Sequence, residues 1–170
     1  MSQVKTIFIV DDDATQSTML QDHLSKFPAF TMHVFKTGEE CLKKLDLNPQ
    51  IVFLDYNFDL PGAMNGIEIL KKIKAQRPEI EVIMLSGQDK IQVAVNTMKY
   101  GAFDYIVKSE SAFLRSEQVI FNIIKTLKLE GERNKYKKLT YWFAGALIVT
   151  LITIAIVWKM GLIKDHPNIL

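Results

Sequence analysis

Four short apolar runs of this sequence each end at polar residues whose types suit phosphoryl chemistry. These residues are Asp11, Asp12, Asp55, Ser86 and Lys108. Three close carboxylates repel one another unless a cation neutralises them, and Mg²⁺ prefers carboxylates, several waters and a phosphate oxygen. A hydroxyl and an ammonium opposite the metal would complete a cradle for a phosphoryl group. A single residue of this kind at a strand end does not indicate a function, but the joint occurrence of all five indicates a metal-assisted phosphoryl site.

For these side chains to meet, the apolar runs must be strands of one parallel sheet. Five runs are predicted as strands: Thr6–Val10, Thr31–Phe35, Ile51–Leu54, Glu81–Leu85 and Phe103–Val107. The third has four consecutive apolar residues, which is typical of a strand buried on both faces. The carboxyl ends of parallel strands are where ligands bind in open α/β sheets. We therefore expect the five polar residues to share one edge of the sheet.

Amphipathic segments between the strands predict the helices. Asp13 is placed to cap a helix running to about Lys26, and Gly38 opens a second helix through Leu45. A third is predicted over 67–76, with Ile67, Leu70 and Ile73 on its buried face. A fourth covers 91–100, and a last one begins between residues 111 and 117. Strands alternating with helices predict an α/β fold: a flavodoxin-like, doubly wound, five-stranded parallel sheet in the order 2-1-3-4-5.

The C-terminal part of the sequence predicts a transmembrane helix. Residues 139–158 carry no charge, and a helix of this length is about 30 Å long, which matches a bilayer core. Tyr141, Trp142 and Trp158 lie at its two ends, where interfacial aromatic residues belong. Hydroxyls of Thr150 and Thr153 can bond to carbonyls of the same helix. The segment is therefore expected to be a single span.

Basic residues predict its orientation. Six precede the span and two follow it: Lys125, Lys128, Arg133, Lys135, Lys137 and Lys138, then Lys159 and Lys164. The positive-inside rule puts the globular part in the cytoplasm and residues 159–170 outside. Beside a span, such a cluster favours anionic lipid headgroups over nucleic acid as its partner, and a formal net charge of +2 adds no argument for nucleic acid. The single cysteine, Cys41, excludes an internal disulfide and fits a reducing compartment.

These observations divide the sequence into four parts. The globular domain covers residues 1–129, a basic juxtamembrane linker covers 130–138, the span covers 139–158 and a short external tail covers 159–170. The linker could continue the preceding helix, although a glycine at position 131 disfavours this. The first apolar run is too short for a secretory signal.

Residues 4–129 resemble the receiver domain of two-component response regulators. Five segments carry the resemblance: Ile7–Asp13, Val52–Asp55, Met64–Glu68, Met84–Gly87 and Ala94–Lys108. The resemblance implies that Asp55 accepts a phosphoryl group from a histidine kinase or phosphotransfer protein and forms an acyl phosphate. It also implies a phosphoacceptor that catalyses its own phosphorylation and dephosphorylation, and not an enzyme acting on other molecules.

The same resemblance assigns roles to the other site residues. Mg²⁺ would be bound directly by Asp12, largely through water by Asp11, and by Asp55 and the main-chain carbonyl of Asn57. Lys108 would contact the phosphoryl group. Ser86 would close onto it, and Tyr105 would follow by changing rotamer.

Two features depart from the family pattern. Receivers usually have proline after the lysine, and here Ser109 stands in that place. The loop from Asp55 to Gly66 is a few residues longer than usual, with Pro61 and Met64 displaced. Residues in this loop tune kinase access and phosphoryl lifetime in the family.

Two other functions fit parts of the sequence. Asp11, Asp13 and Thr15 match the nucleophile motif of haloacid-dehalogenase-like phosphatases. That family also needs an acidic pair after the lysine, and the acids that follow lie at no predicted strand end: Glu110, Glu117, Glu130 and Glu132. The second alternative is a receiver-shaped membrane anchor or scaffold that acts without phosphorylation, which would not need the complete set of site residues.

The favoured interpretation is a membrane-tethered, single-domain response regulator at the inner face of a bacterial membrane. No DNA-reading segment separates the receiver from the predicted span. Phosphorylation would therefore act through altered contacts with an unknown output protein or through self-association, with no role for nucleic acid.

Overall fold

The computed structural model describes residues 5–27, 30–59, 61–87 and 91–159. Five parallel strands form one sheet in the order β2-β1-β3-β4-β5. The strands are β1 (Lys5–Val10), β2 (Phe30–Phe35), β3 (Ile51–Asp55), β4 (Glu81–Ser86) and β5 (Asp104–Val107). The predicted fold class and strand order are confirmed, so the carboxyl ends of β1, β3, β4 and β5 are neighbours at one edge.

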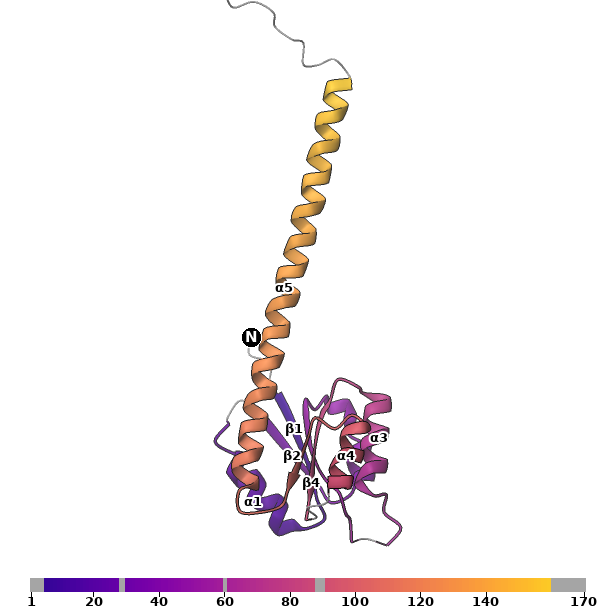
Figure 1. Ribbon diagram of the computed structural model, residues 1–170, viewed down its shortest axis with the longest axis vertical. Coiled ribbons are helices and arrows are strands. Elements are labelled where there is room, and N and C mark those ends of the chain that lie inside the picture. The colour runs from indigo at the N-terminus through magenta and orange to yellow at the C-terminus, as the bar shows by residue number, and fades with distance from the viewer. Residues whose placement is uncertain (1–4, 28–29, 60, 88–90, 160–170) are drawn as a thin grey trace, which may run out of the picture. The chain divides into compact units, whose positions relative to one another are not determined.

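Helices cover both faces of the sheet, with α1 on one side and α3 and α4 on the other (Figure 1). The helices are α1 (Ala14–Leu24), α2 (Gly38–Leu42), α3 (Gly66–Gln76), α4 (Ile91–Lys99) and α5 (Ala112–Lys159), and a short 3₁₀ helix covers Leu45–Leu47. The predicted second helix was too long. Its hydrogen bonds tighten to an i−3 pattern where the Lys44 amide donates to the Cys41 carbonyl, which ends α2.

Side-chain caps fix where the helices begin. One carboxylate oxygen of Asp13 accepts hydrogen bonds from the amides of Thr15 and Gln16, as predicted for the start of α1. Asn65 and Glu68 form a reciprocal capping box at the start of α3. These caps set the exits from β1 and from the loop that follows β3.

One face of the sheet packs against α2 and α3 to form an apolar core. The buried members from the sheet include Phe8, Val10, Val52, Leu54, Val82 and Met84. From α3 they are Ile69, Leu70 and Ile73, so the prediction of Ile67 on this face was wrong. The helix begins at Gly66, and residues 66, 69, 70 and 73 follow its periodicity from that start. A Cβ at Gly66 would lie 2.3 Å from the carbonyl oxygen of Asp55, which requires glycine there.

The chain divides into two compact units, residues 1–123 and 124–170. The backbone of α5 stays helical through Gly131, so this glycine does not interrupt it. Within Tyr136–Lys159 of α5, an 18-residue stretch has a mean hydropathy of 2.1, and none of its residues is buried. By length and composition this segment can cross a membrane. Of the predicted external tail, residues 160–170 lie outside the described residues.

The hydroxyls within this apolar segment have partners inside the helix. Thr150 donates to the carbonyl oxygen of Leu147 at 2.7 Å, and Thr153 donates to that of Thr150 at 2.7 Å. Both bonds are of the kind predicted, so these hydroxyls need no water.

Candidate functional site

Three carboxylates meet at the carboxyl edge of the sheet. Asp11 and Asp12 follow β1, and Asp55 is the last residue of β3. One oxygen from each side chain lies within 4.8 Å of the others. Asp11 is 2% exposed and Asp55 is 5% exposed. The strand pairing therefore brings these acids together, as the sequence predicted.

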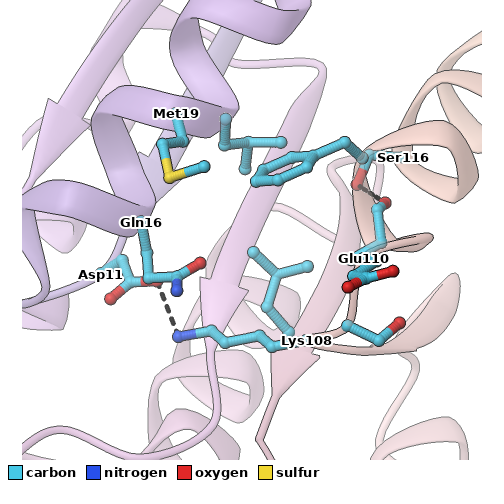
Figure 2. Close-up of a pocket in the computed structure, with 11 residues that line it drawn as sticks. Asp11, Gln16, Met19, Lys108, Glu110 and Ser116 are labelled. Carbon is cyan, nitrogen blue, oxygen red and sulfur yellow. Dashed lines mark hydrogen bonds and ion pairs between the residues drawn. The ribbon is translucent and has the colours of Figure 1, made fainter.

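Lys108 bridges two of these acids from the end of β5. Its Nζ lies 2.8 Å from Asp11 Oδ2 and 3.0 Å from Asp55 Oδ1. Figure 2 shows the ammonium directed at Asp11. Burial alone would lower the pKa of Lys108, but its contacts with Asp11 and Asp55 outweigh burial and raise the pKa. The side chain therefore remains a cation that can attract an anionic group to this edge.

The surroundings of the Asp55 carboxyl disfavour its ionised form. Burial raises its pKa from 3.8 to about 6, Lys108 opposes the rise, and the charge of Asp11 adds to it. The Tyr56 amide also donates to Asp55 Oδ1 at 2.8 Å. Without a metal ion, ionised Asp55 therefore destabilises the fold, since the carboxylate is only partly compensated by its partners.

Because ionised Asp55 destabilises the folded state, we expect Asp55→Asn to stabilise the metal-free protein. Well below pH 3.8, Asp55 is protonated in the folded and unfolded states, so the variant gains nothing, and at about pH 4 its gain should still be small. Above about pH 6, it is ionised in both states, and the gain should reach on the order of 2 kcal/mol.

Urea unfolding of residues 1–130 in EDTA, at about pH 4 and about pH 7.5, measures this difference. Asp46→Asn is a matched control, because Asp46 is exposed and should change stability by less than about 0.5 kcal/mol. Equal stability of wild type and Asp55→Asn at the higher pH would contradict the environment described for Asp55.

The other predicted residues lie at or near the same edge. Ser86 is fully buried at the end of β4, and its carbonyl accepts the Lys108 amide at 2.7 Å. Asn57 lines an acidic hollow over the carboxylates, together with Asp59 and Gly87. Tyr105 is partly buried and packs against the apolar core that contains α3. The structure thus gathers the predicted residues from the ends of β1, β3, β4 and β5 at one edge, apart from Tyr105, which packs against the core.

The donor set fits Mg²⁺. The ion binds oxygen in a compact octahedron in which opposite donors lie about 4 Å apart, and it keeps several waters. Carboxylate oxygens within 4.8 Å of one another can therefore share one ion, directly or through water. Sulfur and imidazole groups, which favour other metals, are missing from the described lining of the hollow.

A second hollow lies beside Lys108, between α1 and the segment leading into α5. Gln16 and Met19 line it from α1, and Glu110 and Ser116 line it from the other side (Figure 2). Ser109, which stands where proline was expected, also lines it, and its carbonyl accepts the Ala112 amide at 2.9 Å. The serine thus takes part in the turn that leads into α5.

Sequence reasoning missed one contact to the site. The Asp59 amide donates to Asp12 Oδ2 at 2.9 Å, across a separation of 47 residues. The unusual length of the loop was the one signal in the sequence that pointed to this region.

Comparisons with known proteins agree with this geometry. The family model of the response regulator receiver domain matches residues 7–115, which is more than half of the chain. The nitrogen assimilation regulatory protein NtrX of Azorhizobium caulinodans is 32% identical over 136 residues, covering 79% of this chain and 29% of that protein. The regulatory protein AtoC of Escherichia coli is 28% identical over 109 residues, covering 64% of this chain and 23% of that protein. The chain thus spans less than a third of the length of these curated relatives.

Solved structures show the same fold. The receiver domain of NtrX from Brucella abortus has a TM-score of 0.60 and 30% identity, covering 72% of this chain and 98% of that chain. The CheY-like receiver domain protein of Methanospirillum hungatei has a TM-score of 0.62 and 27% identity, covering 74% of this chain and 98% of that chain. In both cases the similarity covers a complete receiver domain.

Proposed function

Because this chain belongs to the response regulator receiver family, we propose that it is a phosphorylation switch in which Asp55 accepts the phosphoryl group. Receiver domains are phosphoacceptors that histidine kinases or phosphotransfer proteins phosphorylate, and they bind Mg²⁺ at an acidic pocket. The observation that carries the proposal is the buried Asp55 carboxylate, with Lys108 at 3.0 Å and two further acids beside it. The family match favours this function over the phosphatase alternative.

Each group at the edge has a role in the proposed reaction. A carboxylate oxygen of Asp55 forms a bond to phosphorus as the bond between phosphorus and the donor's nitrogen breaks. Asp11, Asp12, Asp55 and the main-chain carbonyl of Asn57 would hold Mg²⁺, which neutralises charge between the carboxylate and the phosphoryl oxygens. Lys108 turns its ammonium from the acids to a phosphoryl oxygen and compensates charge there.

The reaction can be tested directly on the full chain in detergent micelles. Incubation with acetyl phosphate should add a single phosphate when Mg²⁺ is present and none in EDTA, measured by intact mass. The adduct should be lost in base or hydroxylamine, as acyl phosphates are. Incorporation that is independent of Mg²⁺, or an adduct stable to both treatments, would contradict the proposal.

The output we propose is a change in protein contacts, through a partner or a second copy. Ser86 would close onto the phosphoryl group, and Tyr105 would turn inward, altering the surface formed by α4, β5 and α5. A phosphoryl group shifts this equilibrium only through contacts that differ between the two states. Ser86 and Lys108 should therefore set the size of the response.

Ser86→Ala should reduce this response. In the wild-type chain, crosslinking with and without beryllofluoride and Mg²⁺ should capture different partners or a different oligomeric state. The difference should shrink in Ser86→Ala, because the hydroxyl that closes onto the phosphoryl mimic is gone. Identical captured sets for the wild type in both forms would favour a passive anchor instead.

We also propose that the chain is anchored in a bacterial inner membrane. Residues 1–129 would be the cytoplasmic receiver, 130–138 a basic linker at anionic headgroups, 139–158 the span and 159–170 an external tail. The exposed apolar segment Tyr136–Lys159 supports this proposal, because an isolated apolar helix of this length is stable in a bilayer and not in water.

A further inference from the structure

The lengthened loop between β3 and α3 is tied to the rest of the domain at two places. Near its start, the Asp59 amide donates to Asp12 Oδ2 at 2.9 Å. Near its end, the Met64 amide donates to Glu39 Oε1 at 3.1 Å, which lowers the pKa of Glu39. Both acceptors are carboxylates from other elements, and hydrogen bonds to charged acceptors are stronger than those between neutral groups.

Side chains beside these two amides anchor the loop to the core. Phe58 and Met64 are partly buried and pack against the apolar core that contains α3. The capping box of Asn65 and Glu68 fixes the far end of the loop where α3 begins. The residue before Asp59 is therefore anchored by apolar packing, and the far end of the loop is fixed at Met64 and at the start of α3.

The contact restricts a residue that belongs to the proposed metal site. Asp12 is only half-buried, so little packing prevents its side chain from rotating. With one of its oxygens accepting the Asp59 amide, the carboxylate is held in one orientation beside Asp11 and Asp55. Groups that orient a ligand side chain raise metal affinity because the bound geometry is already present before the ion arrives.

We propose that the Asp59 main-chain amide is a positioning group for the metal ion, acting through Asp12, and that the tie between Glu39 and Met64 supports it. The proposal rests on the proposed Mg²⁺ site. The exposed carboxylate of Asp59 is not the acting group; the amide is. The loop after β3 thus sets how tightly the domain binds its ion, and a carboxylate on α2 influences that affinity from outside the site.

Titration calorimetry of Mg²⁺ against the full chain in detergent micelles tests this directly. Asp59→Pro removes the amide hydrogen and should weaken Mg²⁺ binding about 10-fold or more. Asp59→Ala removes the same carboxylate from the lining of the hollow but keeps the amide, so it should bind Mg²⁺ about 10-fold more tightly than Asp59→Pro. Equal weakening in the two variants would overturn the proposal, since the side chain would then be responsible.

A second pair of variants avoids proline. Glu39→Ala removes the acceptor for the Met64 amide and should weaken Mg²⁺ binding, while Glu39→Gln keeps an acceptor oxygen and should restore it. Equal Mg²⁺ affinity of these two variants would contradict the supporting role proposed for the contact between Glu39 and Met64. Thermal unfolding in EDTA checks that all variants are folded.

Asp12→Ala separates this inference from the site on which it rests. If Asp12→Ala weakens Mg²⁺ binding and Asp59→Pro does not, the loop has no positioning role and the metal site stands. If Asp12→Ala itself leaves Mg²⁺ binding unchanged, the metal site has been placed on the wrong residues and both proposals are overturned.

Discussion

Replacing Asp55 by asparagine should abolish the incorporation of phosphate from acetyl phosphate. The amide has nearly the size of the carboxylate but is not a nucleophile here, so no acyl phosphate can form. The fold should persist, because the variant removes a buried carboxylate whose pKa is raised by burial to about 6 in the metal-free protein. Intact mass after incubation with Mg²⁺ should therefore show the full shift in the wild type and none in the variant.

Controls distinguish loss of the nucleophile from general damage. Asp46→Asn changes an exposed aspartate away from the site and should be phosphorylated like the wild type. Lys108→Ala should be phosphorylated more slowly, because the ammonium that neutralises phosphoryl charge is missing. Undiminished labelling of Asp55→Asn would mean that another group is the acceptor.

Removing the apolar helix should release the protein from the membrane. A chain ending at Glu130 lacks the segment Tyr136–Lys159 and should be recovered in the soluble fraction. The full chain should stay in the membrane pellet after alkaline carbonate washing, because about 20 apolar residues are enough to span the hydrocarbon core. A full chain recovered in the carbonate supernatant would contradict the anchor.

A single substitution in the middle of the segment tests the same proposal without truncation. Leu151→Arg should reduce the membrane fraction, since arginine at the centre of a span adds about 2.5–3.5 kcal/mol to the free energy of insertion, whereas leucine there is slightly favourable. Leu151→Ala keeps the segment apolar and should remain in the pellet. A reporter fused after Leu170 should be active outside the cytoplasm; activity on the cytoplasmic side would reverse the proposed orientation.

The sheet and its order were predictable because they depend on short-range patterns. Runs such as Ile51–Leu54 are apolar throughout and end at a polar residue, and the right-handed crossover rule limits how such strands can be connected. The meeting of Asp11, Asp55 and Lys108 then followed from the strand order alone. No knowledge of side-chain packing was needed for this step.

Features that depend on packing were not predictable in the same way. On α3, Leu70 and Ile73 are buried as predicted, but Ile67 is not and Gly66 is buried in its place, where close contact with the Asp55 carbonyl excludes a side chain. The hydrogen bond from the Asp59 amide to Asp12 joins residues that are 47 apart in the sequence. Its donor is the main chain, so no pattern of side-chain types predicts it. The buried start of α3 and the contact between Asp59 and Asp12 both depend on how the loop after β3 packs.

The most direct test of the central claim is to identify the residue that carries the phosphoryl group. After incubation with acetyl phosphate and Mg²⁺, borohydride reduction converts an aspartyl phosphate to homoserine, which peptide mass spectrometry locates. The predicted result is homoserine at position 55, with unchanged aspartates at positions 11, 12, 13 and 59. Conversion at any of those four positions in place of Asp55, or a modified peptide without homoserine, would contradict Asp55 as the phosphoacceptor.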